Sequence, residues 1–120
     1  MADKKSNNNQ GEIVIYQSEN GDTKIDVRFV DETVWLTQAQ LCELYQTSKA
    51  NVSEHIKHIF EEGELIEVAV VRKFRTTATD GKQYNVNHYN LDMIISLGYR
   101  VKSRTATHFR RWATECLKNI

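Results

Sequence analysis

The sequence predicts an α+β domain, and three patterns within its 120 residues support this fold class. Two β-hairpin patterns, each with a tight-turn dipeptide, flank residues 37–60. Between the hairpins, the spacing of apolar residues changes from two to about 3.6, which indicates helices. Two further helical patterns follow the second hairpin. A chain of this length with 40% hydrophobic residues can build one core, so we expect a single domain.

The N-terminal region predicts a polar tail followed by an antiparallel β meander. Residues 1–11 are rich in Asn and Lys and have little to bury, so we expect a disordered tail there and an ordered domain over residues 12–120. The runs GEIVIYQ and TKIDVRFV flank Asn20-Gly21, a pair that readily adopts the positive φ angles of a tight hairpin turn. A short third strand at residues 33–36 would complete the meander.

Residues 37–60 have the pattern of a helix-turn-helix. Thr37 is placed as an N-cap, and Gln40 three residues later completes a capping box. A second helix begins after Ser48, with apolar residues at positions i, i+4, i+7 and i+8. The turn departs from the usual pattern, because Gln46 stands where Gly is common. Two core helices that meet by chance are the alternative.

The second hairpin pattern, residues 68–89, is typical of a wing. It follows the second helix directly, and it turns at Asp80-Gly81. Basic side chains near this turn would lie along a phosphate backbone. The alternative is a hairpin that only closes the sheet.

The C-terminal region predicts two helices that pack over the core. Asn90 is the candidate N-cap of the first, over residues 91–97, and Ser103 or Thr105 opens the second. The chain stops inside this last pattern, so we expect it to be the N-terminal part of a longer protein. Together these elements predict a winged helix-turn-helix-like domain with an N-terminal antiparallel β meander and two C-terminal helices.

Charge is distributed unevenly along the chain, although its net charge is zero. From Leu97 to the end, six basic residues accompany a single acid, Glu115, which gives this segment a net charge of +5. The rest of the chain must therefore be net negative. This asymmetry indicates one electropositive face, with an ordinary solvated surface as the alternative.

These patterns favour double-stranded DNA as the partner. A helix-turn-helix places the exposed, polar start of its second helix in the major groove. The candidate base contacts are Lys49, Asn51, Ser53 and Lys57. The candidate phosphate contacts are Lys73, Arg75, Lys82, Arg100, Lys102 and Arg104. Such proteins commonly bind two-fold sites as dimers, so a homodimer is compatible with this interpretation, although the sequence does not indicate a dimer face.

The sequence also resembles a known family over nearly all residues after Gly11. The segments VWLTQAQ, ISLGYRV and FRRWAT resemble the N-terminal region of bacterial RhuM-type virulence proteins. More distantly, LDMIISLGYRV and FRRWAT are similar to segments of phage antirepressor-type DNA-binding domains. The resemblance implies a DNA-binding or regulatory role and no catalysis.

Enzyme, metal and membrane signatures are absent from the sequence. There is no GxSxG, HExxH, phosphate-binding Gly-rich loop or paired-carboxylate motif, so we expect no catalysis, no cofactor and no small-molecule ligand. His55 and His58 have a spacing that could suit a metal, but surface histidines are the simpler interpretation, because no acidic or Cys partner stands at a supporting distance in the sequence. Cys42 and Cys116 lack metal or redox spacing. Without a membrane span or secretion signal, we expect a cytoplasmic protein.

A protein-interaction module is the rival hypothesis. In this case the helix-turn-helix scaffold would dock a partner or regulate a fused effector. The neutral net charge favours it, as do Glu54 on the second helix and the acidic run Glu61, Glu62, Glu64 and Glu67, since these carboxylates would repel phosphate.

Overall fold

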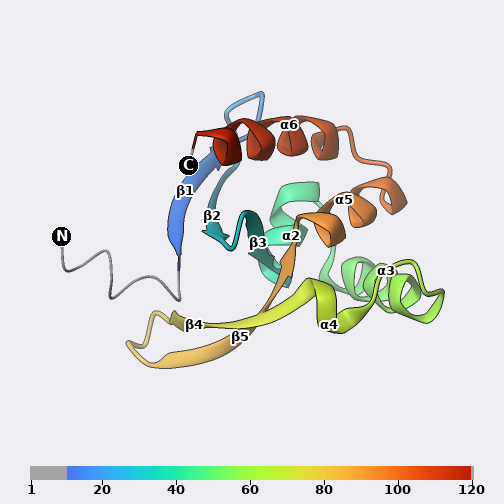
Figure 1. The fold of residues 1–120 in the computed structure, drawn as a ribbon, viewed down its shortest axis with the longest axis horizontal. Coiled ribbons are helices and arrows are strands. Elements are labelled where there is room, and N and C mark those ends of the chain that lie inside the picture. The colour runs from blue at the N-terminus through green and yellow to red at the C-terminus, as the bar shows by residue number, and fades with distance from the viewer. Residues whose placement is uncertain (1–10, 120) are drawn as a thin grey trace.

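A five-stranded antiparallel sheet with helices packed against it forms the fold, which confirms the α+β class (Figure 1). The computed structural model describes residues 11–119, and the expected tail at residues 1–10 lies outside them. The strands are β1 (Glu12–Gln17), β2 (Lys24–Val30), β3 (Thr33–Thr37), β4 (Val71–Thr77) and β5 (Gln83–Asn90). The helices are α2 (Gln38–Tyr45), α3 (Lys49–Glu61), α4 (Glu67–Val70), α5 (Leu91–Arg100) and α6 (Thr105–Lys118).

The first three strands form the predicted antiparallel meander. In the turn between β1 and β2, the Ser18 N–H donates to the Thr23 carbonyl oxygen at 2.9 Å, and Gly21 has a φ of 79°. The turn between β2 and β3 consists of Asp31 and Glu32, whose φ angles are 54° and 62°. A two-residue turn with both residues in the left-handed region matches the twist of the strands that it joins.

Helices α2 and α3 are joined by a short turn, as the sequence predicts. The capping box at the start of α2 is confirmed, with the Thr37 hydroxyl accepting from the Gln40 N–H and the Gln40 side chain accepting from the Thr37 N–H. Gln46 ends α2 with a φ of 53°, so it takes the left-handed conformation for which Gly is the usual choice. Ser48 caps α3 by accepting from the Asn51 N–H at 3.0 Å.

The pairing of β3 with β5 joins the meander and the second hairpin into one sheet, with the strand order β1-β2-β3-β5-β4. The opposed residues are Trp35 with Asn90, Leu36 with Tyr89 and Thr37 with His88. The sequence patterns predict each hairpin but not this pairing, because its partners lie far apart in the chain. As a result, α2 begins where the sheet meets the second hairpin.

The helices cover one face of the sheet and enclose the main core. Tyr16 of β1 meets Phe109 and Trp112 of α6 edge to face, with ring centroids 5.0 and 5.1 Å apart. Helix α5 approaches α6 at Gly98, where an added Cβ would collide with the side chain of Ala106. The absence of a side chain at residue 98 therefore allows the two predicted C-terminal helices to pack closely.

Candidate nucleic-acid interface

The second hairpin extends away from the rest of the sheet, and its turn lies on the side opposite α3 (Figure 1). Its strands pair in an unbroken register between residues 71–77 and residues 83–89. The predicted turn at Asp80-Gly81 is confirmed, since Gly81 has a φ of 83°. The first strand starts later than expected, because residues 67–70 form the short helix α4 instead of strand.

Two basic residues of β4 lie on the same side of the hairpin as the helices. Side chains alternate between the two sides of a strand, and Val71 packs against the core on the helix side. Lys73 and Arg75 share that side, opposite Asn87 and Asn85 of β5. Both basic side chains are exposed. Their charges therefore lie on the side of the sheet that the helices cover and not on the opposite face.

The start of α3 lies next to this hairpin. Lys49, its first residue, lines a hollow of about 540 Å³ together with Gln38 of α2 and Asn87 and Tyr89 of β5. Asn87 stands opposite Lys73 in the hairpin, so Lys73 is the β4 neighbour of a residue that lines the same hollow as Lys49. We use the name basic face for Lys49 of α3 and the exposed hairpin cations Lys73, Arg75 and Lys82, the last of which lies in the turn.

Two of the predicted base contacts are already engaged within the protein. The half-buried Asn51 donates from Nδ2 to the Thr47 hydroxyl at 2.8 Å, so its side chain helps to close the turn before α3. The Ser53 hydroxyl accepts from the side-chain amide of Gln38 and links α3 to α2. Sequence reasoning missed these bonds, because neither lies within a recognised capping pattern.

The other two predicted base contacts, Lys49 and Lys57, are exposed on α3. Within residues 11–119, neither of them takes part in an ion pair. The same helix carries acids: Glu54 lies 3.1 Å from the His58 ring, and Glu61 is exposed. Helix α3 therefore presents both signs of charge, with the cation Lys49 at the end that adjoins the hairpin.

Arg100 is half-buried and pairs with two acidic residues at the protein surface. Its Nη2 lies 2.7 Å from a carboxylate oxygen of Glu62 and 2.7 Å from one of Glu64. Hydrogen bonding to Arg100 lowers the pKa of both carboxyl groups, and the two acids in turn raise the pKa of Arg100 above its usual range. The Arg100 charge is thus compensated, and the side chain ties α5 to the end of α3.

The remaining predicted phosphate contacts, Lys102 and Arg104, are exposed in the connection between α5 and α6. Lys102 and Arg104 closely follow Arg100, which is bound to residues just after the end of α3. The basic face instead includes Lys49, the first residue of that helix. A helix of 13 residues is about 20 Å long. The six predicted phosphate contacts therefore fall into two groups at opposite ends of α3.

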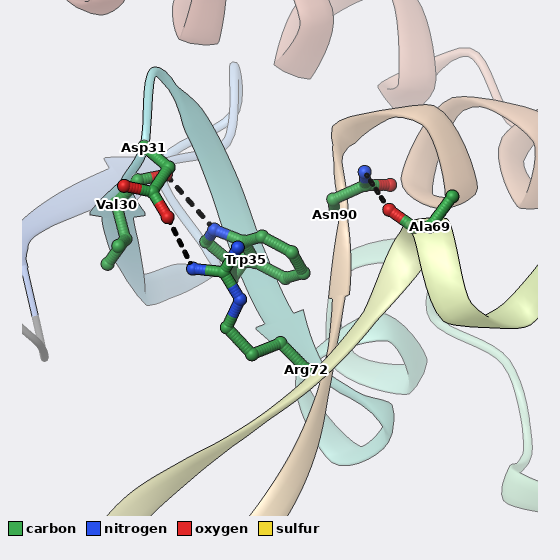
Figure 2. A network of polar contacts seen from close by, with 6 residues as sticks. All are labelled: Val30, Asp31, Trp35, Ala69, Arg72 and Asn90. Carbon is green, nitrogen blue, oxygen red and sulfur yellow. Dashed lines mark hydrogen bonds and ion pairs between the residues drawn. The ribbon is translucent and has the colours of Figure 1, made fainter.

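A polar and aromatic network fixes the base of the hairpin to the meander (Figure 2). Arg72 of β4 pairs with Asp31 in the turn between β2 and β3 at 2.7 Å, and its guanidinium lies over the Trp35 ring, 4.6 Å from the centroid. The Trp35 indole N–H donates to the Val30 carbonyl oxygen at 3.2 Å. Trp35, Val30 and Phe74 form a second small core on the face of the sheet opposite the main core. These contacts hold the hairpin in a defined position relative to the meander.

His88 is buried against the same small core. It is 3% exposed, and its ring meets that of Phe74 edge to face with centroids 5.0 Å apart. Burial lowers the pKa of His88; the hydrogen bond between Nδ1 and the Val86 carbonyl oxygen opposes this shift, and the nearby Arg28 adds to it. The neutral imidazole is therefore the form that suits this position.

The part of the chain that the structure describes contains no metal-binding cluster, no disulfide and no membrane-spanning helix. No three His, Cys, Asp or Glu residues among residues 11–119 lie together so that they could hold a metal ion, and His55 and His58 have no third ligand there. Cys42 and Cys116 are free thiols. Within the same residues, no helix is both long enough and apolar enough to span a membrane.

Comparison with known proteins gives one match. Residues 69–120 match the model of the Virulence protein RhuM family, which confirms the resemblance for this segment. The segment contains the hairpin, α5 and α6, but not the α2–α3 pair. No curated protein and no solved structure matches the chain. The family description names no biochemical activity, so a function must be argued from the geometry.

The stability of the protein should fall as the pH is lowered from about 7 to 5, in part through His88. Its pKa is lowered in the folded state, so the unfolded chain takes up this proton first, once the pH falls below the ordinary value of about 6.5. Urea denaturation at several pH values would measure the effect. In the variant His88→Gln this part of the pH dependence should disappear, and an equal dependence in both proteins would contradict the assignment.

Proposed function

We propose that this chain, with its RhuM-family C-terminal segment, is a winged helix-turn-helix-like module that binds double-stranded DNA. In this proposal the start of α3 enters the major groove and the β4–β5 hairpin follows the phosphate backbone. The observation that carries the proposal is the basic face, in which Lys49 lines a hollow with Asn87, the residue opposite Lys73 in the hairpin. We propose binding alone for these residues and no catalytic step.

The arrangement of the helix pair supports the proposal. Helix α2 buries its apolar side in the core, and α3 is anchored from beneath by Val52, Ile56 and Ile59. This leaves the opposite side of α3 exposed, as entry into a groove requires. The hairpin is fixed by Arg72 and Trp35, so it would meet the backbone without first being ordered.

The individual contacts differ from those suggested by the sequence pattern. We assign direct DNA contacts on α3 to Lys49 and Lys57, and a positioning role to Asn51 and Ser53, whose side chains already bond to Thr47 and Gln38. A positioning residue affects binding through the orientation of α3.

The phosphate contacts are assigned to both ends of α3. Lys73, Arg75 and Lys82 would contact the backbone beside the start of the helix, and Lys102 and Arg104 would contact it beyond the other end. Arg100 is left out of the interface, because its charge is already compensated by Glu62 and Glu64.

A protein-interaction module is the second candidate function. Ile66 and Val68, next to the acidic run, are 68% and 86% exposed, and apolar side chains of this kind are commonly buried against a protein partner. Glu54 and Glu61 on α3 also favour such a partner over DNA. In this case salt-dependent binding to DNA would be absent.

The triple variant Lys73→Ala/Arg75→Ala/Lys82→Ala should bind mixed duplex DNA with a weaker salt dependence. Each lost phosphate contact should reduce the slope of log K against log salt by about 0.9. Fluorescence anisotropy at about 50 to 200 mM salt measures this slope. The matched control, Lys24→Ala/Arg111→Ala/Lys118→Ala, removes equal charge from exposed positions on β2 and α6. Similar slopes in the two variants would exclude the hairpin from the interface.

Asn51→Ala should lower the stability of the protein by up to about 1 kcal/mol and leave its choice of DNA sequence unchanged. The reason is that Asn51 bonds to Thr47 and holds the turn before α3. Urea denaturation gives the stability, and anisotropy with a selected site and its single-base variants gives the sequence preference. Loss of about 1 to 3 kcal/mol of discrimination at one base pair would instead make Asn51 a base contact.

A further inference from the structure

Strand β1 forms one edge of the sheet and exposes apolar side chains. It pairs only with β2, and the strand order leaves its other side open among the described residues. Val14 and Tyr16 point to the helix side, where they join the core. Ile13 and Ile15 point to the opposite side and are 49% and 60% exposed. Figure 1 shows β1 at the far side of the sheet from the second hairpin.

The two edges of the sheet differ in how they are protected. Natural edge strands usually carry Lys, Pro or a bulge that prevents pairing with another chain. Strand β1, EIVIYQ, has none of these, and its register with β2 is unbroken from Glu12 to Gln17. The other edge strand, β4, carries the three cations Arg72, Lys73 and Arg75. Pairing with a second strand is therefore opposed at β4 and unopposed at β1.

We propose that β1 pairs antiparallel with β1 of a second copy of this chain, joining two sheets across a two-fold axis. An axis at Val14 places Ile13 opposite the partner's Ile15 and Ile15 opposite the partner's Ile13. Four isoleucine side chains then cover one another on the face that the helices leave open. The outward backbone N–H and C=O groups of β1 gain partners in the same step.

The charges of β1 make a second copy the occupant that fits best. In this register Glu12, the only charged residue of the strand, stands opposite the partner's Tyr16, so the two carboxylates lie at opposite ends of the interface. Two copies of β4 would instead oppose like charges, which destabilises a strand pair. Pairing of β1 with β4 would be head to tail and would leave a free edge for further copies, whereas pairing of β1 with itself gives a finite dimer.

This dimer goes beyond the proposed DNA binding and does not depend on it. Because β1 and β4 are opposite edges of the sheet, pairing through β1 leaves both hairpins at the outer ends of the dimer. Each basic face then remains accessible. The oligomeric state can be measured without DNA, so failure of the dimer and failure of DNA binding are separate results.

The test is sedimentation equilibrium of the whole chain, without DNA, from about 1 µM to about 1 mM. The wild-type protein should show a reversible monomer–dimer equilibrium, and Ile13→Lys/Ile15→Lys should raise its Kd about a hundredfold. The matched control is Tyr84→Lys/Tyr99→Lys, which adds the same charges on β5 and α5 at side chains that are also apolar and exposed. It should dimerise like the wild type.

A monomer throughout this range would overturn the proposal, and so would a dimer that only the control variant disrupts. Hydrogen exchange provides a second measurement on the wild-type protein, which does not require a folded variant. Alternate amides of β1 face away from β2, and their protection should rise with protein concentration. If the wild-type protein dimerises but exchange of the β1 amides does not depend on protein concentration, the dimer contact lies elsewhere and the proposal is wrong.

Discussion

The pairing of β3 with β5 determines where the basic face lies. Thr37 belongs both to the sheet, where it stands opposite His88, and to the helix pair, where it caps α2. Helix α3 follows α2 after a short turn, so its first residue, Lys49, comes to lie beside Asn87 of the hairpin. Without this strand pairing, the hairpin and the helix pair would be positioned only by residues 62–70 and by their contacts with α5.

A chain with zero net charge can attract a polyanion only through the distribution of its charges. In this fold, Arg72 and Arg100 pair with acids and serve the structure: Arg72 holds the hairpin to the meander, and Arg100 holds α5 to the end of α3. The lysines of α3 and the hairpin are exposed and have no such partner among the described residues. Ion pairs within the protein thus compensate the charges of Arg72 and Arg100, whereas the lysines of the basic face remain uncompensated among the described residues.

Local patterns predicted much of the fold, and contacts between distant residues account for what they missed. The capping box at Thr37 and the Asp80-Gly81 turn depend on neighbouring residues, so a single sequence reveals them. The β3–β5 pairing and the bond between Gln38 and Ser53 depend on the folded arrangement, and no sequence spacing signals them. The same limit applies to the site: charge and exposure identified the lysines, whereas the internal partners of Asn51 and Arg100 appeared only in the structure.

The most direct test of the account is NMR mapping of a bound DNA duplex on the ¹⁵N-labelled chain at low salt. The account predicts that amide shifts change at the start of α3 and along residues 73–87, and that β1 amides stay unchanged as duplex is added at constant protein concentration. Shift changes that avoid both α3 and the hairpin would contradict the proposed interface. The absence of any change, with the protein folded and duplex in excess, would contradict DNA binding by this chain and favour a protein partner.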